Sequence, residues 1–161
     1  ELAKPEMFWP ETSHDGRPIQ SWILHPPNFD AESQYPLLLE IHGGPVSNYG
    51  DRVAGELQLY SAAGFEVVYT NPRGSTGYGE EWGDLLYQDY PGNEYEDLIS
   101  AGDAVIERGY IDEDQLYVTG GSAGGIMTAC GFLSMLYSPF NIATMISLSL
   151  SAPGMLCRAG G

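Results

Sequence analysis

The 161-residue sequence is poor in basic residues and in cysteine, and its apolar runs are short. Six Lys and Arg stand against 22 Asp and Glu, giving a formal net charge of -16. A chain this acidic repels phosphate backbones and anionic lipids, which disfavours nucleic acid and membrane surfaces as partners. The longest apolar stretch, 142–150, is interrupted by polar residues and falls short of the ~20 residues of a membrane helix.

Several other signals are missing. Cys130 and Cys157 are too few for a disulfide framework. The first residues, ELAKPEMFWP, contain no apolar signal-peptide core, which favours the cytoplasm. The acidic groups at 80–81, 94–97 and 112–114 lack metal-ligand spacing and are typical of solvated surfaces. We therefore expect neither a metal nor a cofactor.

What the sequence does contain is an alternation of strand and helix patterns within a length suited to one domain. Asp15-Gly16 predicts a hairpin turn between the first two strands. Gly64 and Gly109 are typical helix stops, and Asn93 with Glu96 three positions later predicts a capping box. The predicted strands are 6–9, 19–25, 36–41, 65–70, 115–119 and 145–150, and the predicted helices are 54–63, 93–109 and 126–136. This order predicts an α/β fold, a mostly parallel sheet with helices on both faces.

The strongest chemical motif is Gly120-Gly121-Ser122-Ala123-Gly124, which matches G-x-S-x-G. It lies between a β-branched strand and an apolar helix, where a sharp turn exposes the serine as a nucleophile. The turn needs small residues at Gly120 and Gly124. Phosphate-binding loops also join strand to helix, but neither G-x-G-x-x-G nor the P-loop pattern matches here. A glycine-rich turn with an incidental serine is the remaining alternative.

The segment His42-Gly43-Gly44-Pro45 follows the first long apolar strand. In α/β-hydrolases the loop at this place donates one oxyanion-hole amide, and the residue after the nucleophile donates the other. We assign these roles to the N–H groups of Gly44 and Ala123. A plain turn is the alternative interpretation.

All three histidines precede Ser122, and no His, Asp or Glu follows it. This is unexpected, because the order in this fold is Ser, then Asp or Glu, then His. We expect His42 to order its own loop rather than act as a base, and His14 and His25 to be surface residues.

Arg73, at the end of a predicted buried strand, is expected to pair with an acid such as Asp97 in a structural role.

Four runs occur in order: LLLEIHGGP, GFEVVYTNPRGSTGYGEEW, YEDLISAGDAVIERGYID and LYVTGGSAGG. Together they resemble the catalytic domain of the prolyl oligopeptidase family, nearest to its acylaminoacyl-peptidase-like and dipeptidyl-peptidase-like branches. The resemblance implies a serine peptidase of the α/β-hydrolase fold that cleaves short peptides with Ser122. It supports Gly44 and Ala123 as the oxyanion hole. Some relatives place a tyrosine hydroxyl where His42 stands, so here the loop backbone is the expected donor.

The resemblance weakens after Pro139, and the ending SLSLSAPGMLCRAGG does not resemble the family, so the strands that would carry the catalytic Asp and His are not found. We therefore expect residues 1–161 to form a single partial peptidase domain, truncated at its C-terminal end, without the family's β-propeller and inactive or nearly so alone. An uncovered edge at strand 145–150 would favour self-association. An esterase or lipase, and a non-catalytic hydrolase-fold fragment, are the alternatives.

Overall fold

The computed structural model describes residues 2–44, 46–50 and 52–135. The predicted strand 145–150, and the self-association expected through it, lie outside this part of the chain. The described strands are β1 (Glu6–Phe8), β2 (Ser21–Leu24), β3 (Tyr35–Ile41), β4 (Glu66–Thr70) and β5 (Ile111–Gly120). The described helices are α1 (Gly55–Ala62), α2 (Glu80–Asp84), α3 (Glu94–Ile106) and α4 (Ala123–Met135).

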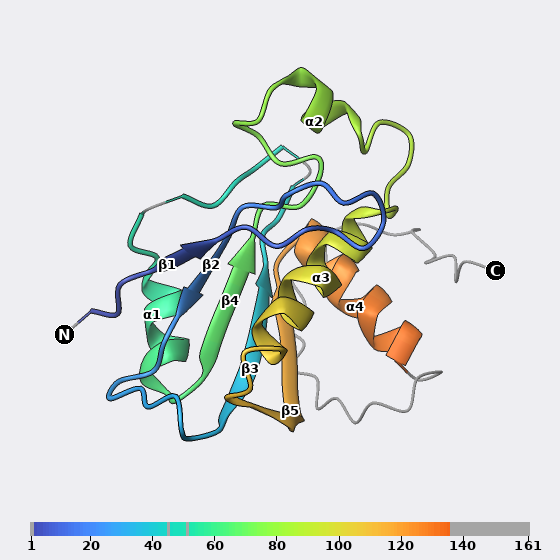
Figure 1. The fold of residues 1–161 in the computed structure, drawn as a ribbon. Helices are drawn as coiled ribbons and strands as arrows, with labels where there is room; N and C mark the ends of the chain where they lie inside the picture. The colour runs from blue at the N-terminus through green and yellow to red at the C-terminus, as the bar shows by residue number, and fades with distance from the viewer. Residues whose placement is uncertain (1, 45, 51, 136–161) are drawn as a thin grey trace.

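The strands form one mixed sheet in the order β1-β2-β4-β3-β5 (Figure 1). β3 is parallel to both β4 and β5, so the carboxyl ends of these three strands meet at one edge. β1 and β2 are antiparallel, as the predicted hairpin requires, and β2 joins the sheet antiparallel to β4. The predicted parallel sheet is therefore confirmed for β4, β3 and β5, which carry the loops of interest.

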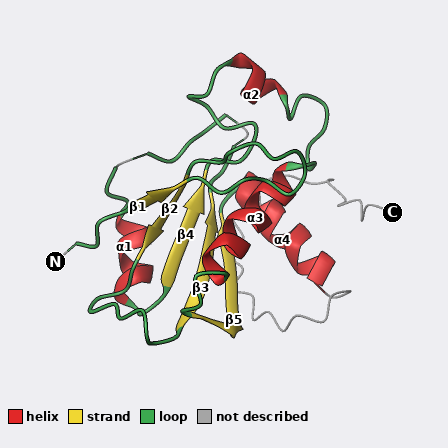
Figure 2. Ribbon diagram, in the orientation of Figure 1, coloured by secondary structure: helices red, strands yellow, loops and turns green. Residues whose placement is uncertain are grey.

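Helices cover both faces of the sheet, as predicted, with α3 in front and α1 behind in the view of Figure 2. Alternation along the strands sorts the apolar side chains into two buried clusters. On β4, for example, Val68 belongs to the cluster that includes Leu98 of α3, whereas Val67 belongs to the cluster that includes Leu57 of α1. β4 is thus enclosed on both faces, which agrees with the burial of all five of its residues.

The structure departs from the sequence predictions in three places. Asn93 does precede α3, but its side chain makes no capping hydrogen bond, so the capping box is wrong. The Glu96 carboxylate instead accepts a hydrogen bond from the Ser13 hydroxyl of the β1–β2 hairpin, at 3.0 Å. The short helix α2 was not predicted, and β5 begins at Ile111 rather than at residue 115.

His25, which was predicted to be a surface residue, is half-buried. Its side chain is 25% exposed, and its Nδ1 lies 2.8 Å from Oε1 of Glu66, a side chain with no exposed surface. Phe29 stacks on the imidazole at 4.1 Å between ring centroids. His14, by contrast, is exposed in the hairpin, as expected.

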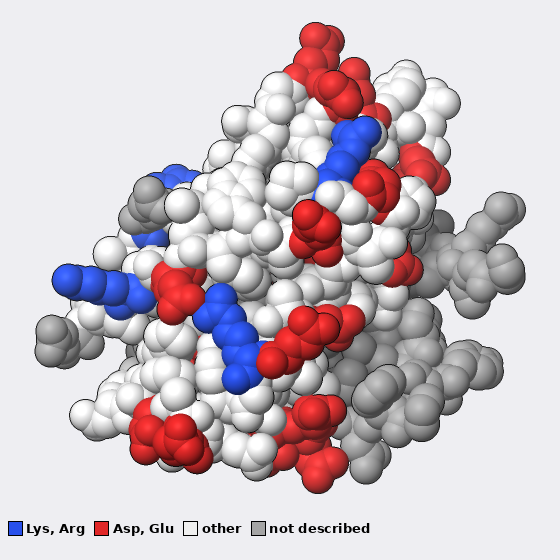
Figure 3. Space-filling view, viewed as in Figure 1, with Lys and Arg blue, Asp and Glu red and all other residues white. Residues whose placement is uncertain are grey.

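On the face drawn in Figure 3 acidic groups are spread more widely than basic ones, and several of the basic side chains lie beside acidic ones. Arg108 reaches Glu6 at 2.6 Å, and Arg17 reaches Asp15 at 3.3 Å. Exposed pairs of this kind contribute little to stability. They neutralise the charges of Arg17 and Arg108, so these cations do little to offset the acidic charge of the surface.

The predicted pair of Arg73 and Asp97 is confirmed, and it joins the end of β4 to the first turn of α3. Both Asp97 carboxylate oxygens accept bonds from the guanidinium, at 2.9 Å from Nε and 2.7 Å from Nη2. Oδ2 also accepts the backbone N–H of Arg73 at 2.8 Å. Asp97 raises the pKa of Arg73 mainly through these hydrogen bonds. Because both side chains are almost fully buried, replacing either one leaves the other as a buried charge without its closest partner.

We predict that Asp97→Asn lowers the free energy of unfolding by about 3–5 kcal/mol, the usual cost of breaking a buried ion pair. Asp15→Asn is the matched control, because Asp15 contacts the same guanidinium at 3.3 Å with a side chain that is 28% exposed. It should cost less than about 1 kcal/mol. Urea unfolding followed by circular dichroism measures both, and equal losses would contradict a structural role for the Arg73–Asp97 pair.

Another carboxyl with restricted access to solvent is that of Glu40, a half-buried residue on β3 opposite Tyr69 and Thr119 of the neighbouring strands. Its Oε2 is buried without a hydrogen-bond partner. Burial, helped by the nearby Glu56 carboxylate, raises the pKa of Glu40 from 4.5 to about 8. The folded chain therefore holds this proton more tightly than the unfolded chain does. The resulting stability is fully present below pH 4.5 and is lost as the pH rises through 8.

Glu40→Gln removes this titration. We expect the variant to gain stability over the native chain between pH 5 and pH 8, by about 1–3 kcal/mol at the upper end. Urea unfolding across this range measures the difference, with the exposed Glu113→Gln as a control that should follow the native chain. Parallel curves for Glu40→Gln and the native chain would show that Glu40 is ionised in the folded state.

Candidate active site

Ser122 lies at the turn between β5 and α4, at the carboxyl edge of the sheet. Its φ of 58° places it in the left-handed region, which a non-glycine residue adopts at a cost of about 1–3 kcal/mol. The residue is exposed, whereas Gly120 and Gly124 on either side of it are buried. The strand-to-helix turn thus presents the serine to solvent in the strained geometry that G-x-S-x-G predicts.

The two flanking glycines allow the turn to pack against the end of β3. A Cβ at Gly124 would lie 2.0 Å from the carbonyl oxygen of Ile41 and 2.8 Å from that of His42. A Cβ at Gly120 would lie 2.7 Å from the same Ile41 oxygen. No side chain fits at either position, because the obstructing atoms belong to the backbone. The first turn of α4 and the end of β3 can therefore approach only through glycine.

The loop after β3 lies directly against the serine. A Cβ at Gly43 would be 3.2 Å from Cβ of Ser122 and 3.8 Å from its Oγ. Gly44 follows in the same loop, and both Gly44 and Ala123 line one small cavity. Pro45 lies outside the described residues. All five residues assigned from the sequence, Gly44, Gly120, Ser122, Ala123 and Gly124, thus gather at the junction of the β3 and β5 loops.

His42 forms a hydrogen bond within its own loop, as expected, and also reaches the loop after β4. Its Nδ1 lies 2.7 Å from the carbonyl oxygen of Gly43, and its Nε2 lies 3.0 Å from the Ser75 hydroxyl oxygen. A carbonyl can only accept, so Nδ1 carries the proton and Nε2 of the neutral ring accepts from Ser75. Burial lowers the pKa of His42, which favours this neutral form. Both ring nitrogens therefore fix loops together, and neither is available to take a proton from Ser122.

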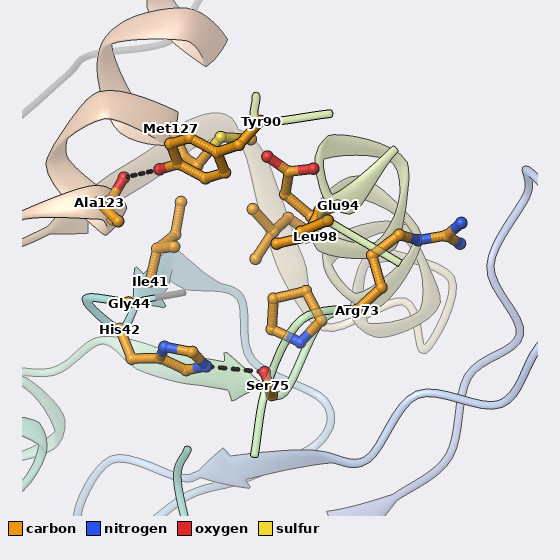
Figure 4. A pocket seen from close by; sticks show the side chains of 13 residues that line it. Ile41, His42, Gly44, Arg73, Ser75, Tyr90, Glu94, Leu98, Ala123 and Met127 are labelled. Atoms are coloured by element: carbon orange, nitrogen blue, oxygen red, sulfur yellow. Dashed lines mark hydrogen bonds between the residues drawn. The ribbon is translucent and has the colours of Figure 1, made fainter. Parts of the chain in front are cut away.

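The small cavity has a volume of about 30 Å³ and lies between the β3 loop, the β4 loop and the starts of α3 and α4 (Figure 4). Its walls include three residues that no sequence motif marked: Ser75, Tyr90 and Glu94. The Tyr90 hydroxyl donates a 2.8 Å hydrogen bond to the carbonyl oxygen of Ala123. Only the fold brings these side chains to the cavity that Gly44 and Ala123 also line.

Within residues 2–44, 46–50 and 52–135, no cluster of three or more His, Cys, Asp or Glu side chains could hold a metal ion. None of the helices in this part is long and apolar enough to span a bilayer. The chemistry that the described site offers is that of a hydroxyl nucleophile beside backbone amides.

We predict that Gly124→Ala destabilises the fold by at least about 1–3 kcal/mol, because the added methyl group meets backbone that cannot yield. Gly121→Ala is the control within the same motif. A Cβ there would have no atom within 4 Å, so we expect little change. Thermal unfolding measures both variants, and a Gly124→Ala protein as stable as Gly121→Ala would refute the close approach of α4 to β3.

Comparisons of sequence place this site in a known context. The model of the prolyl oligopeptidase family matches residues 52–145. The peptidase YuxL of Bacillus subtilis is 45% identical over 117 residues, which are 72% of this chain and 18% of that protein. Dipeptidyl-peptidase 5 of Aspergillus fumigatus is 37% identical over 112 residues, which are 68% of this chain and 16% of that protein. The chain thus spans less than a fifth of the length of these curated relatives.

Solved structures agree with the sequence comparisons. The acylaminoacyl peptidase of Pyrococcus horikoshii superposes with a TM-score of 0.72 at 25% identity, over 79% of this chain and 20% of that one. A puromycin-hydrolyzing peptidase of Mycobacterium tuberculosis gives a TM-score of 0.71 at 28% identity, over 78% and 20%. The fold is that of the α/β-hydrolase peptidases. Because the matched segment 52–145 makes up more than half of the sequence, the chain belongs to the prolyl oligopeptidase family of serine peptidases.

Proposed function

We propose that Ser122 is the nucleophile of a peptidase that cleaves short peptides through an acyl-enzyme. The observation that carries the proposal is the exposed, left-handed Ser122, held directly against the loop that contains Gly43 and Gly44. The peptidase names of the relatives support peptides as the substrate class.

In this proposal the serine hydroxyl attacks a peptide carbonyl, and the carbonyl oxygen becomes an oxyanion. The amides of Gly44 and Ala123 donate hydrogen bonds to it from two sides. Ala123 is the first residue of α4, whose initial N–H groups have no acceptor within the helix and carry its positive dipole end. The tetrahedral intermediate then releases the amine, and water hydrolyses the acyl-serine.

None of the three histidines is placed to act as a base for Ser122. The ring of His42 is engaged at both nitrogens, His25 pairs with Glu66, and His14 lies exposed in the β1–β2 hairpin. No His, Asp or Glu follows Ser122 in the sequence. We propose that the 161 residues supply the nucleophile and the oxyanion hole, and that their turnover of peptides lies far below that of a complete Ser-His-Asp site, by on the order of 10⁶-fold. A Ser-His-Asp site without its base still keeps about 10³–10⁴-fold catalysis over water from the oxyanion hole and binding.

The proposal predicts slow but selective reaction of Ser122 with a fluorophosphonate. Intact mass should show one adduct on the native chain, none on Ser122→Ala, and one on the control Ser13→Ala, whose serine lies in the remote hairpin. Free imidazole in the buffer should accelerate labelling by replacing the missing base.

Two results would contradict this account. Equal labelling of Ser122→Ala and the native chain would show that the serine is not specially reactive. Peptide turnover by the native chain that Ser122→Ala abolishes would show instead that a base is already present.

A further inference from the structure

Tyr90 connects the loop before α3 to the nucleophile turn. Its hydroxyl donates to the carbonyl oxygen of Ala123 at 2.8 Å, and Ala123 directly follows Ser122 (Figure 4). In an α-helix this carbonyl also accepts the amide four residues further on, so the phenol adds a bond from outside the helix. Burial raises the pKa of Tyr90 to about 12, aided by the Glu94 carboxylate, so the donor stays protonated throughout the working range of a peptidase.

Glu94 holds the turn that carries Tyr90. Its Oε2 accepts the backbone N–H of Gly92 at 2.8 Å, which closes the segment 92–94 on itself, two residues after Tyr90. The residue is only 2% exposed. The phenol and this carboxylate thus form one connected support that runs from α3 through the turn to the start of α4.

The other carboxyl oxygen of Glu94, Oε1, is buried and has no hydrogen-bond partner. Leaving a polar atom unpaired costs about 1–3 kcal/mol, so a residue kept in this state calls for an explanation. Glu94 lines the same 30 Å³ cavity as Gly44 and Ala123. A cavity of this size has room for a water molecule but not for a substrate group. The carboxylate therefore lies behind the site and acts on it through its neighbours.

We propose that Tyr90 is a positioning residue for the nucleophile turn and that Glu94 fixes Tyr90 for this role. The inference rests on the proposed function of Ser122. The strained φ of Ser122 persists only while its surroundings hold the turn, and the Tyr90 bond is a hold applied next to the serine. Without the Tyr90 hydrogen bond, the first turn of α4 can shift. The Ala123 amide then no longer points at the position of the oxyanion. Displacements of about 1 Å can cost 10²-fold in rate.

Tyr90→Phe removes only the hydroxyl, and Tyr87→Phe is its matched control in the same loop. Tyr87 is 76% exposed, so we do not expect its hydroxyl to position the nucleophile turn. The rate of fluorophosphonate labelling is measured against probe concentration, with imidazole present. We expect Tyr90→Phe to lower the maximal rate at least about tenfold while the half-saturating concentration and the melting temperature stay near native. Tyr87→Phe should match the native chain in all three.

Amide hydrogen exchange of residues 123–125 gives a second readout that does not depend on the chemistry of Ser122. We expect faster exchange there in Tyr90→Phe and native exchange in Tyr87→Phe. If the native chain is not labelled at all, the proposed function fails while exchange still tests the positioning. Native labelling and native exchange in Tyr90→Phe would overturn the inference.

If Tyr90→Phe folds poorly, two variants of Glu94 test the same positioning role. Glu94→Gln keeps an oxygen that can accept the Gly92 amide, so it should label at close to the native rate. Glu94→Ala removes the acceptor and should reproduce the slower labelling and the faster exchange of residues 123–125. Identical behaviour of these two variants would contradict a role for Glu94 in holding Tyr90.

Discussion

The candidate site depends on one close contact, that between the first turn of α4 and the end of β3. The Cα of Gly124 is so near the Ile41 carbonyl that any side chain would overlap it. This approach brings the loop of Gly43 and Gly44 against Ser122 and turns the serine outward. It follows that the loop proposed to form the oxyanion hole and the turn of the proposed nucleophile are one unit, since neither can move without disturbing the other.

Around this contact, loops from three parallel strands are joined by side chains that perform no chemistry. The imidazole of His42 links the β3 loop to Ser75 after β4. Asp97 fixes the same β4 loop to α3 through Arg73. These hydrogen bonds connect the loops that follow β3 and β4 with α3. They hold the backbone in place beyond the ends of the strands, where the pairing of the sheet stops. The support is polar and buried, and this makes its geometry specific but also sensitive to the loss of single groups.

Much of this arrangement was predictable from the sequence because its causes are local. Apolar runs marked the central strands, Asp15-Gly16 marked the hairpin, and G-x-S-x-G marked the turn. Arg73 and Asp97 could be paired because a charge at the end of a buried strand needs a partner.

The predictions that were wrong involve contacts between segments distant in the sequence. The first residues of β5 are hidden in the sequence by the acidic run 112–114, and they pair with β3 across a register shift between Tyr35 and Leu37. Glu96 matched a capping pattern, yet its carboxylate meets Ser13 of the hairpin. The partner of His25, Glu66, comes from another strand. No local pattern encodes such pairings, which arise only when the sheet has assembled.

The most direct test of the account is a crystal structure of the chain with a phosphonate bound covalently to Ser122. The account predicts that one phosphonyl oxygen lies about 2.7–3.1 Å from both the Gly44 and the Ala123 nitrogen atoms. It also predicts that Ser122 keeps its left-handed backbone. A phosphonyl oxygen directed to solvent, away from both amides, would contradict it.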